Sequence, residues 1–326
     1  MTQDSLGQPS VVTAKAVTRE FSPGVGVSDL TIEIKQGTIL GLVGPSGSGK
    51  TTAVRLMIGL LEPDSGELQV LGTKPTRFSR RHRSSIGYMP QIAVLYPDLS
   101  LWENLAFCAS LFGVPWRGRR KRMDQVLELV ELGDAKHRKF RQASGGMQRR
   151  LSLAATLVHD PDLLFLDEPT AGVDPLLRKK FWDHLTALSR SGKTVCVTTQ
   201  YVSEAAYFDL VGVMHSGRIL VVEEPDALRR RALGGDVVVI RTTEPLGAGR
   251  LEDMAEAVGA NRVDLRAANQ GRLVVEDAGD AIPVITDWAS RQGVNVESIE
   301  QEIPPFDDVF VELIHALAPE EADGRG

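Results

Sequence analysis

The sequence has little cysteine and no long hydrophobic run. Its two cysteines, Cys108 and Cys196, lie far apart and lack the spacing of a metal site. We therefore expect two reduced, buried thiols rather than a disulfide framework or a zinc centre. No window approaches the ~18 consecutive apolar residues that a membrane-spanning helix needs. Residues 1–9 lack the pattern of a signal peptide, so the sequence predicts a cytosolic protein.

Internal repeats, low-complexity tracts and sustained heptads are also absent, and the histidines show no metal-ligand spacing. The composition is that of a globular protein, with 42% apolar and 25% charged residues, and 326 residues suggest about two domains. Charge is uneven: residues 74–150 contain 16 basic and 6 acidic residues, whereas residues 235–326 contain 7 basic and 19 acidic ones. Such asymmetry is compatible with a nucleic-acid-facing or membrane-facing patch, but the basic clusters are separate, which favours solvated surface.

Buried strands alternate with long helical patterns in the first two thirds of the chain. Apolar runs at 38–43, 162–167 and 194–199 predict strands, and helical periodicity covers 101–112, 119–132 and 147–159. This alternation predicts an α/β fold with a mainly parallel sheet and helices on its faces.

The pattern changes at Gly234-Gly235. Residues 236–300 read as strand, helix, two strands, helix and strand, which is compatible with a small ferredoxin-like α+β domain followed by a helix at 307–317. We expect a main domain at 11–234, a helical subdomain at about 92–150, an accessory domain at 235–318, and disorder at 1–10 and 319–326.

A phosphate-binding loop follows the first of these strands. The segment Gly44-Pro-Ser-Gly-Ser-Gly-Lys-Thr51 lies between a strand and a helical pattern. Its glycines let backbone N–H groups surround phosphates, and the helix N-terminus adds a favourable dipole. Lys50 would reach the β- and γ-phosphate oxygens, and the Thr51 hydroxyl would bind Mg²⁺. The predicted nucleotide-binding residues of this loop are Gly44, Pro45, Ser46, Gly47, Ser48, Gly49, Lys50, Thr51 and Thr52.

Two acidic residues end the second strand, in Leu163-Leu-Phe-Leu-Asp167-Glu168. A carboxylate at the end of a strand beside the phosphate loop can hold the Mg²⁺ shell, which is the role predicted for Asp167. Glu168 can polarise the attacking water as a general base. The two motifs together predict a P-loop NTPase.

A third motif points to a family. The segment Ala143-Ser144-Gly145-Gly146-Met147 resembles the ABC signature motif, about 20 residues before Asp167. Ser144 can cap the helix that begins after it and leave N–H groups facing outward. The resemblance implies that Ser144, Gly145, Gly146 and Met147 contact the γ-phosphate of ATP held by a second protomer.

Further positions match the same family. Gln91 resembles the glutamine that ligates Mg²⁺ and links the ATP site to the helical subdomain, and Asp174 lies in a segment that resembles the D-loop at the dimer interface. Phe21 stands where the family has an aromatic residue on adenine, although a core phenylalanine is also plausible. Gln200 replaces the histidine that usually bonds the γ-phosphate; an amide can donate a hydrogen bond but cannot become cationic.

Thr198-Thr-Gln-Tyr201 and the segment 305–312 are similar to the daunorubicin-resistance and nodulation-export branch of ABC ATPases. The resemblance implies an ATPase that uses ATP and Mg²⁺, forms a homodimer or heterodimer, and energises a separate membrane permease of the ABC-2 export type at the cytoplasmic face of the membrane. An importer ATPase is the nearest alternative. A soluble ABC ATPase acting on nucleic acid or ribosomes, and a P-loop kinase or GTPase, are less compatible with the motifs, and no nucleic-acid partner is expected.

Overall fold

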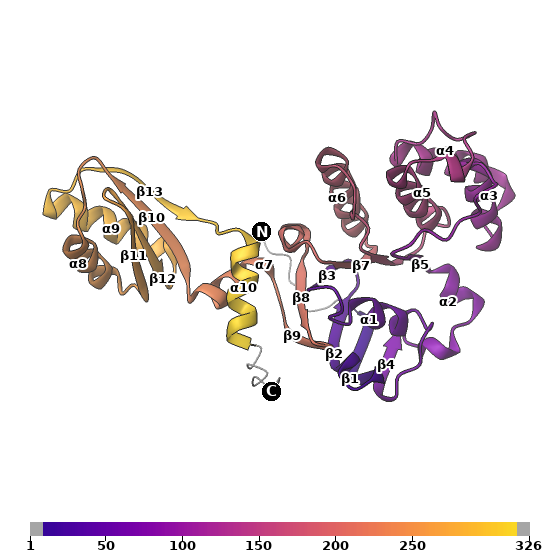
Figure 1. Cartoon of the computed structure of the whole chain (residues 1–326), viewed down its shortest axis with the longest axis horizontal. Coiled ribbons are helices and arrows are strands. Elements are labelled where there is room, and N and C mark those ends of the chain that lie inside the picture. Colours follow the sequence, from indigo (N-terminus) through magenta and orange to yellow (C-terminus); the bar gives the residue numbers. More distant parts are fainter. Residues whose placement is uncertain (1–8, 318–326) are drawn as a thin grey trace, which may run out of the picture. The chain divides into compact units, whose positions relative to one another are not determined.

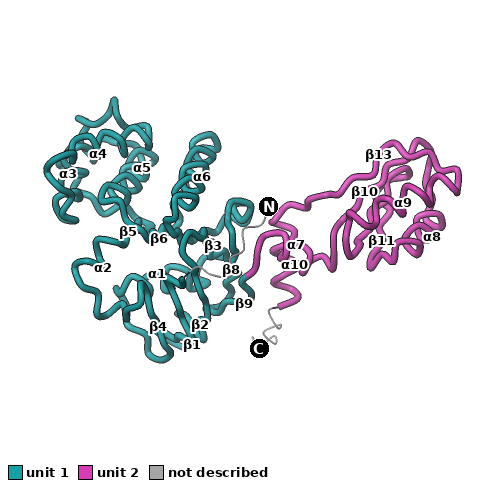
Figure 2. The backbone as a smooth tube through the Cα atoms, turned by 180° about the vertical axis from the view of Figure 1, so that it is seen from behind, with its two compact units in different colours: residues 1–222 teal, residues 223–326 magenta. Residues whose placement is uncertain are grey.

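The computed structural model describes residues 9–317. Its contacts divide the chain into two compact units, residues 1–222 and 223–326 (Figure 2). The boundary between the units, after Val222, lies before the change of pattern at Gly234-Gly235, because α7 (Pro225–Leu233) packs against α10 (Phe306–Leu317). In this contact the Arg229 guanidinium lies 3.9 Å from the centroid of the Phe306 ring. The glycine pair therefore follows a helix that belongs to the second unit.

A six-stranded sheet lies at the centre of unit 1, in the order β5-β6-β7-β3-β8-β9. The pairs β5–β6, β6–β7, β7–β3 and β3–β8 are parallel. The last strand, β9, follows β8 through the two-residue turn Ser216-Gly217, which requires an antiparallel edge. The sheet is therefore mixed and mainly parallel, as predicted. The bounds of its strands are β3 Ile39–Val43, β5 Ile86–Met89, β6 Leu163–Asp167, β7 Thr194–Thr199, β8 Leu210–His215 and β9 Arg218–Glu223.

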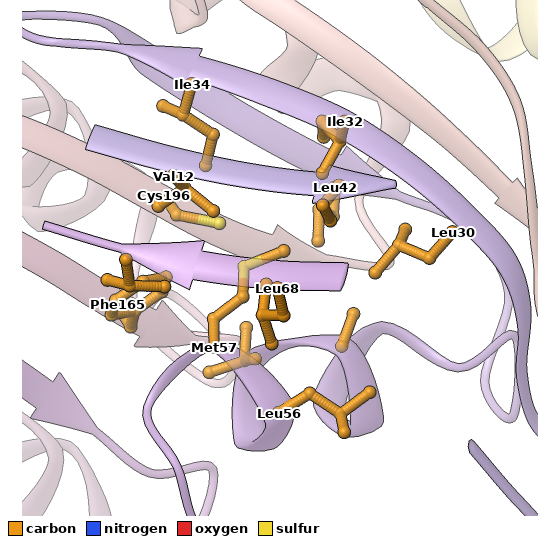
Figure 3. Packing of buried hydrophobic residues seen from close by; sticks show 14 of the residues in the cluster. Val12, Leu30, Ile32, Ile34, Leu42, Leu56, Met57, Leu68, Phe165 and Cys196 are labelled. Atoms are coloured by element: carbon orange, nitrogen blue, oxygen red, sulfur yellow. The ribbon is translucent and has the colours of Figure 1, made fainter. Parts of the chain in front are cut away.

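A three-stranded antiparallel sheet, β2-β1-β4, completes the core of unit 1. Its strands are β1 Ser10–Ser22, β2 Val25–Lys35 and β4 Ser65–Val70, and the helix α1 Lys50–Met57 packs between the two sheets. Figure 3 shows Leu56 and Met57 of α1 among side chains from both sheets, including Ile32, Leu42 and Phe165. This packing fixes the helix that follows the phosphate loop.

Three helices group together away from the antiparallel sheet (Figure 1): α3 Leu101–Leu111, α4 Trp116–Leu129 and α5 Gly145–Leu157. Ser100 and Glu103 form a capping box at the start of α3, and Ser144 caps α5. The short α2 Arg80–Ser84 precedes β5, and α6 Pro175–Arg190 precedes β7. The helical subdomain predicted at about 92–150 overlaps this group, and α5 continues beyond it to Leu157.

Unit 2 contains a four-stranded antiparallel sheet in the order β11-β12-β10-β13. In chain order this is 2-3-1-4, the arrangement of a ferredoxin-like βαββαβ motif. Helices α8 and α9 pack on this sheet, and their common core includes Val238 and Leu273 of the sheet and Ile285 of α9. The bounds of these elements are β10 Asp236–Thr242, α8 Ala248–Val258, β11 Arg262–Ala267, β12 Gln270–Val275, α9 Ala278–Gln292 and β13 Val296–Glu302.

Disorder was expected for residues 1–10, but Pro9 and Ser10 are ordered in the structure. Ser10 begins β1, and the Pro9 carbonyl accepts a hydrogen bond from the Gln36 amide at 3.0 Å. Residues 1–8 and the expected disordered tail at 319–326 lie outside the described residues. Within residues 9–317, no helix combines the length and apolar character needed to cross a membrane.

Candidate active site

The phosphate loop occupies the connection between β3 and α1, as its motif predicts. Gly47 and Gly49 have φ values of 82° and 96°, in the left-handed region that favours glycine. A side chain on Gly49 would also come within 2.6 Å of the Gly26 carbonyl oxygen. The loop conformation therefore requires glycine at position 49, and the β1–β2 hairpin lies directly beside it.

Lys50 is buried, with 5% of its surface exposed, and its ammonium group faces the loop. Its Nζ donates hydrogen bonds at 2.8 Å to the carbonyl oxygens of Gly44 and Pro45. Burial lowers the pKa of Lys50, and the charges of Glu168 and Asp167 oppose that shift. The loop thus holds a cation at its centre, on oxygen atoms that a phosphate can replace.

Asp167 lies at the end of β6 with its side chain completely buried. Its Oδ1 accepts hydrogen bonds from the hydroxyls of Thr51, at 3.1 Å, and Thr198. Its Oδ2 is buried and has no hydrogen-bond partner within the described residues. A buried carboxylate oxygen without a donor is costly unless a cation or a further donor joins it.

Glu168 leaves the strand in an unusual conformation. Its φ is 48°, in the left-handed region that few residues other than glycine adopt. Its amide donates to the Thr198 carbonyl at 3.0 Å and hydroxyl at 3.1 Å, which hold this turn. The Gln91 side-chain amide donates to Glu168 Oε2 at 3.0 Å. Backbone strain of this kind gathers at functional sites, and here it places a carboxylate beside the phosphate loop.

The oxygen atoms of this site fit Mg²⁺. The cation prefers oxygen ligands and uses one or two carboxylates together with substrate phosphates and water. Thr51, Gln91 and Asp167 offer a hydroxyl, an amide and a carboxylate, and the unpaired Oδ2 of Asp167 is the atom that a cation would satisfy. No group of three His, Cys, Asp or Glu side chains suited to a metal occurs in residues 9–317, so the nucleotide would have to complete the shell.

Arg149 of α5 contacts the site, and the sequence patterns did not single it out. Its guanidinium donates to the carbonyl oxygens of Asp167, at 3.1 Å, Pro169, at 3.4 Å, and Gln91. These bonds join the helix that begins at Ser144 to the ends of β5 and β6. All three partners are backbone oxygens from segments distant in sequence, so no side-chain pattern could reveal the contact. Thr198 was also missed as a site residue, because the contact of its hydroxyl with the Asp167 carboxylate depends on the pairing of β6 with β7.

The N-terminus of α5 faces outward. Ser144 and Gly145 are exposed, Gly146 and Met147 are half-buried, and Ser144 Oγ accepts a hydrogen bond from the Met147 amide at 3.3 Å. The structure therefore leaves this helix end accessible, as the interpretation of the segment as a partner-contacting motif requires. Within the single chain, no hydrogen bond joins it to the phosphate loop among the described residues.

Comparison with known proteins identifies the family. Residues 27–171 match the family described as ABC transporter. The chain is 34% identical over 308 residues to the daunorubicin resistance ATP-binding protein DrrA3 of Streptomyces coeruleorubidus, an alignment that covers 93% of this chain and 96% of that protein. The chain belongs to the ABC transporter ATP-binding family.

Two further similarities show how much of this chain and of its relatives the alignments cover. The chain is 37% identical over 223 residues to the probable multidrug ABC transporter ATP-binding protein YbhF of Escherichia coli (strain K12), covering 68% of this chain but 39% of that protein. It therefore spans well under half the length of this relative. The dimeric post-hydrolysis structure of the ATP-binding cassette MJ0796 with ADP and Pi superposes with a TM-score of 0.61 at 28% identity, over 65% of this chain and 98% of that one.

Three other predicted positions of this ABC chain lie around the core of the site. Phe21, on β1, is 53% exposed, so it is not a core phenylalanine, and the Arg19 guanidinium lies 5.4 Å from its ring centroid. Asp174 caps α6 by accepting from the Leu177 amide at 3.0 Å. Gln200 follows β7 with an exposed side chain that makes no hydrogen bond within the described residues. The structure places these residues near the ends of site-forming strands and helices but does not join them to the Lys50–Glu168 group.

Proposed function

We propose that this ABC chain binds and hydrolyses ATP and thereby energises a separate export permease of the ABC-2 type at the cytoplasmic face of the membrane. The observation that carries the proposal is the group formed by Lys50, Thr51, Asp167, Glu168 and Gln91 at one phosphate loop. In this group lie the buried Lys50 ammonium, the buried Asp167 carboxylate and the carboxylate of Glu168, whose backbone has a positive φ. Cation, hydroxyl and carboxylate at a P-loop are the parts that phosphoryl transfer from ATP needs.

Each side chain of this group has a distinct task in the proposal. Lys50 exchanges its loop carbonyls for the β- and γ-phosphate oxygens, and Phe21 stacks on adenine. Glu168, oriented by Gln91, accepts a proton from water as that water attacks the γ-phosphorus in line with the leaving β–γ bridging oxygen, which gives ADP and phosphate. Thr51, Asp167 and Gln91 would hold Mg²⁺, which would neutralise part of the phosphate charge.

The complete site takes a second protomer in this proposal. The exposed Ser144 end of α5 would contact the γ-phosphate of ATP held at Lys50 of the partner, where helix N–H groups favour an anion. Asp174 would lie at the same interface, and Gln200 would donate to the γ-phosphate. The dimeric form of the MJ0796 cassette supports this arrangement.

The export role rests on the relatives. DrrA3 is named for daunorubicin resistance and YbhF as a probable multidrug ABC transporter ATP-binding protein, and a relative from Ralstonia nicotianae, 35% identical over 258 residues, is named for Nod factor export. The transported compound would contact the permease rather than this chain.

The test is the variant Glu168→Gln, which keeps the Gln91 contact but removes the base. We expect hydrolysis to fall by about a hundredfold or more, because a general base contributes roughly 10²–10⁴. ATP should then accumulate in a stable dimer, visible by sedimentation velocity with MgATP. The double variant Glu168→Gln/Lys50→Ala is the control, since it cannot hold the phosphates and should remain monomeric. A monomeric Glu168→Gln protein that still binds ATP would rule out the two-protomer site.

A further inference from the structure

The corner between α3 and α4 carries an exposed tryptophan ahead of a dense basic run. Trp116 is 86% exposed, whereas Trp182 is completely buried and Trp102 and Trp288 are half-buried. Five of the six residues after it are basic: Arg117, Arg119, Arg120, Lys121 and Arg122. Arg117 and Gly118 depart from helical dihedral angles, so Trp116 stands on a bend before the regular part of α4.

A groove of about 720 Å³ opens between the two helices beside this corner. Trp102 and Trp116 both line it, and its other lining side chains include Arg119, Arg120 and Lys136. None of the described residues that line the groove is acidic, although Asp124 meets Lys136 at 3.3 Å from outside the lining. The groove therefore combines indole surface with positive charge.

Two of the basic side chains are used by the fold itself. Arg119 donates to the Val114 carbonyl at 3.0 Å and to Ser110 Oγ at 2.8 Å, and Arg122 donates to the Leu157 carbonyl at 2.7 Å. In contrast, Arg117, Arg120 and Lys121 are exposed and make no hydrogen bond or ion pair within the part of the chain that the structure describes. These three cations remain available to an external anion.

Exposed apolar side chains near this corner favour one class of binding partner over another. Leu111, at the end of α3, is 63% exposed, and Phe107, one turn earlier, is 43% exposed. Nucleic acid binds through cations and aromatic rings, and an exposed leucine adds nothing to that contact. Tryptophan, leucine and basic residues together match a phospholipid interface, where indole rings lie at headgroup level and cations meet phosphates.

We propose that the α3–α4 corner, defined by Leu111, Trp116, Arg117, Arg120 and Lys121, binds the anionic phospholipid surface of the membrane. Trp116 and Leu111 enter the headgroup region, and the three free cations contact lipid phosphates. The inference rests on the proposed function for its setting, since the permease brings the chain to the membrane. The lipid contact would add to the permease contact and orient the helical group toward the bilayer.

The test uses the purified full-length chain without any permease. It is sedimented with vesicles of phosphatidylcholine, with or without phosphatidylglycerol, at low and at physiological salt. We expect binding to the phosphatidylglycerol vesicles that weakens as salt rises. Arg120→Glu should weaken this binding about tenfold, because it replaces one attraction to the anionic surface by a repulsion. The matched control is Arg190→Glu, the same charge change at the exposed end of α6, and it should bind as the unchanged protein does.

Tryptophan emission gives a second readout. The emission of Trp116 should shift to shorter wavelength on vesicle binding and should be quenched by brominated lipid. Trp116→Ala should lose most of both effects. Leu60→Ala, which removes an exposed leucine elsewhere, should keep them. Equal binding to both kinds of vesicle, equal behaviour of Arg120→Glu and Arg190→Glu, or tighter binding to DNA than to vesicles would overturn the inference. ATP binding, measured on the same samples, reports on the proposed function separately.

Discussion

At the scale of single residues, Arg149 links the helix that begins after Ser144 to the backbone on either side of Glu168. Its guanidinium spans the carbonyl oxygens of Gln91, Asp167 and Pro169. We expect Arg149→Ala to lower the ATP hydrolysis rate by about tenfold to a hundredfold, because small displacements of reacting groups have effects of this size. ATP affinity should change little, since the Lys50 loop is untouched. Steady-state hydrolysis and equilibrium binding of a fluorescent nucleotide measure the two quantities.

Arg150 provides a matched control for this prediction. It is the next residue of α5, and its guanidinium also donates to backbone carbonyls, those of Val130 at 3.0 Å and Glu131 at 3.2 Å, away from the site. Both Ala variants should lose about 1–3 kcal/mol of stability through unsatisfied carbonyl groups. Only Arg149→Ala should also slow hydrolysis, and equal rates in the two variants would contradict the positioning role.

The sequence predicted the residues that belong to recognisable motifs and missed Arg149 and Thr198, whose side chains contact the site across elements distant in sequence. Lys50, Thr51, Asp167 and Glu168 were predicted because motif spacing reports phosphate and carboxylate chemistry directly. The structure joins Thr51 to Asp167 by a hydrogen bond, and Lys50 and Glu168 are their neighbours in sequence; the nucleotide-binding role of the four stays a prediction. The left-handed turn at Glu168, held by Thr198, depends on pairing between β6 and β7, which no local pattern encodes.

At the scale of elements, Ser144 has two roles that can be tested separately: it caps α5, and in the proposal it contacts the ATP of a second protomer. Ser144→Ala should remove about 1 kcal/mol of stability, the usual effect of losing an N-cap. Ser100→Ala removes the equivalent cap of α3 and should have a similar effect on urea unfolding. In the Glu168→Gln background, we expect Ser144→Ala to weaken the MgATP-dependent dimer and Ser100→Ala to leave it intact. Sedimentation velocity checks this, and equal dimerisation of both variants would confine Ser144 to capping.

Three of the six strands of the mainly parallel sheet and the elements from β10 to α10 could be predicted, whereas the antiparallel β2-β1-β4 sheet could not. In the parallel sheet, strands buried on both faces appear as continuous apolar runs, which is how β3, β6 and β7 were found. In β1, the pairing shifts register between Ala14 and Val17, and Ala16 has a φ of 50°. These irregularities break the two-residue alternation that would have revealed the strand.

At the scale of the whole molecule, each compact unit has its own hydrophobic core. One core joins the two sheets of unit 1 through α1, and the other joins the sheet of unit 2 to α8 and α9. All predicted nucleotide-binding residues, from Phe21 to Gln200, belong to unit 1. A ligand that binds one folded unit stabilises that unit, by RT ln(1 + [L]/Kd), and leaves the other unchanged.

Calorimetry of the intact chain should therefore show two unfolding transitions, of which MgATP raises one. At a hundredfold excess over Kd, the stabilisation of unit 1 is about 2.7 kcal/mol. Ile285→Ala, in the buried core of unit 2, should lower the other transition through a loss of about 2–5 kcal/mol. Ile34→Ala, equally buried in unit 1, should lower the ATP-responsive transition instead. A single transition that all three changes shift together would show that the two cores unfold as one cooperative unit.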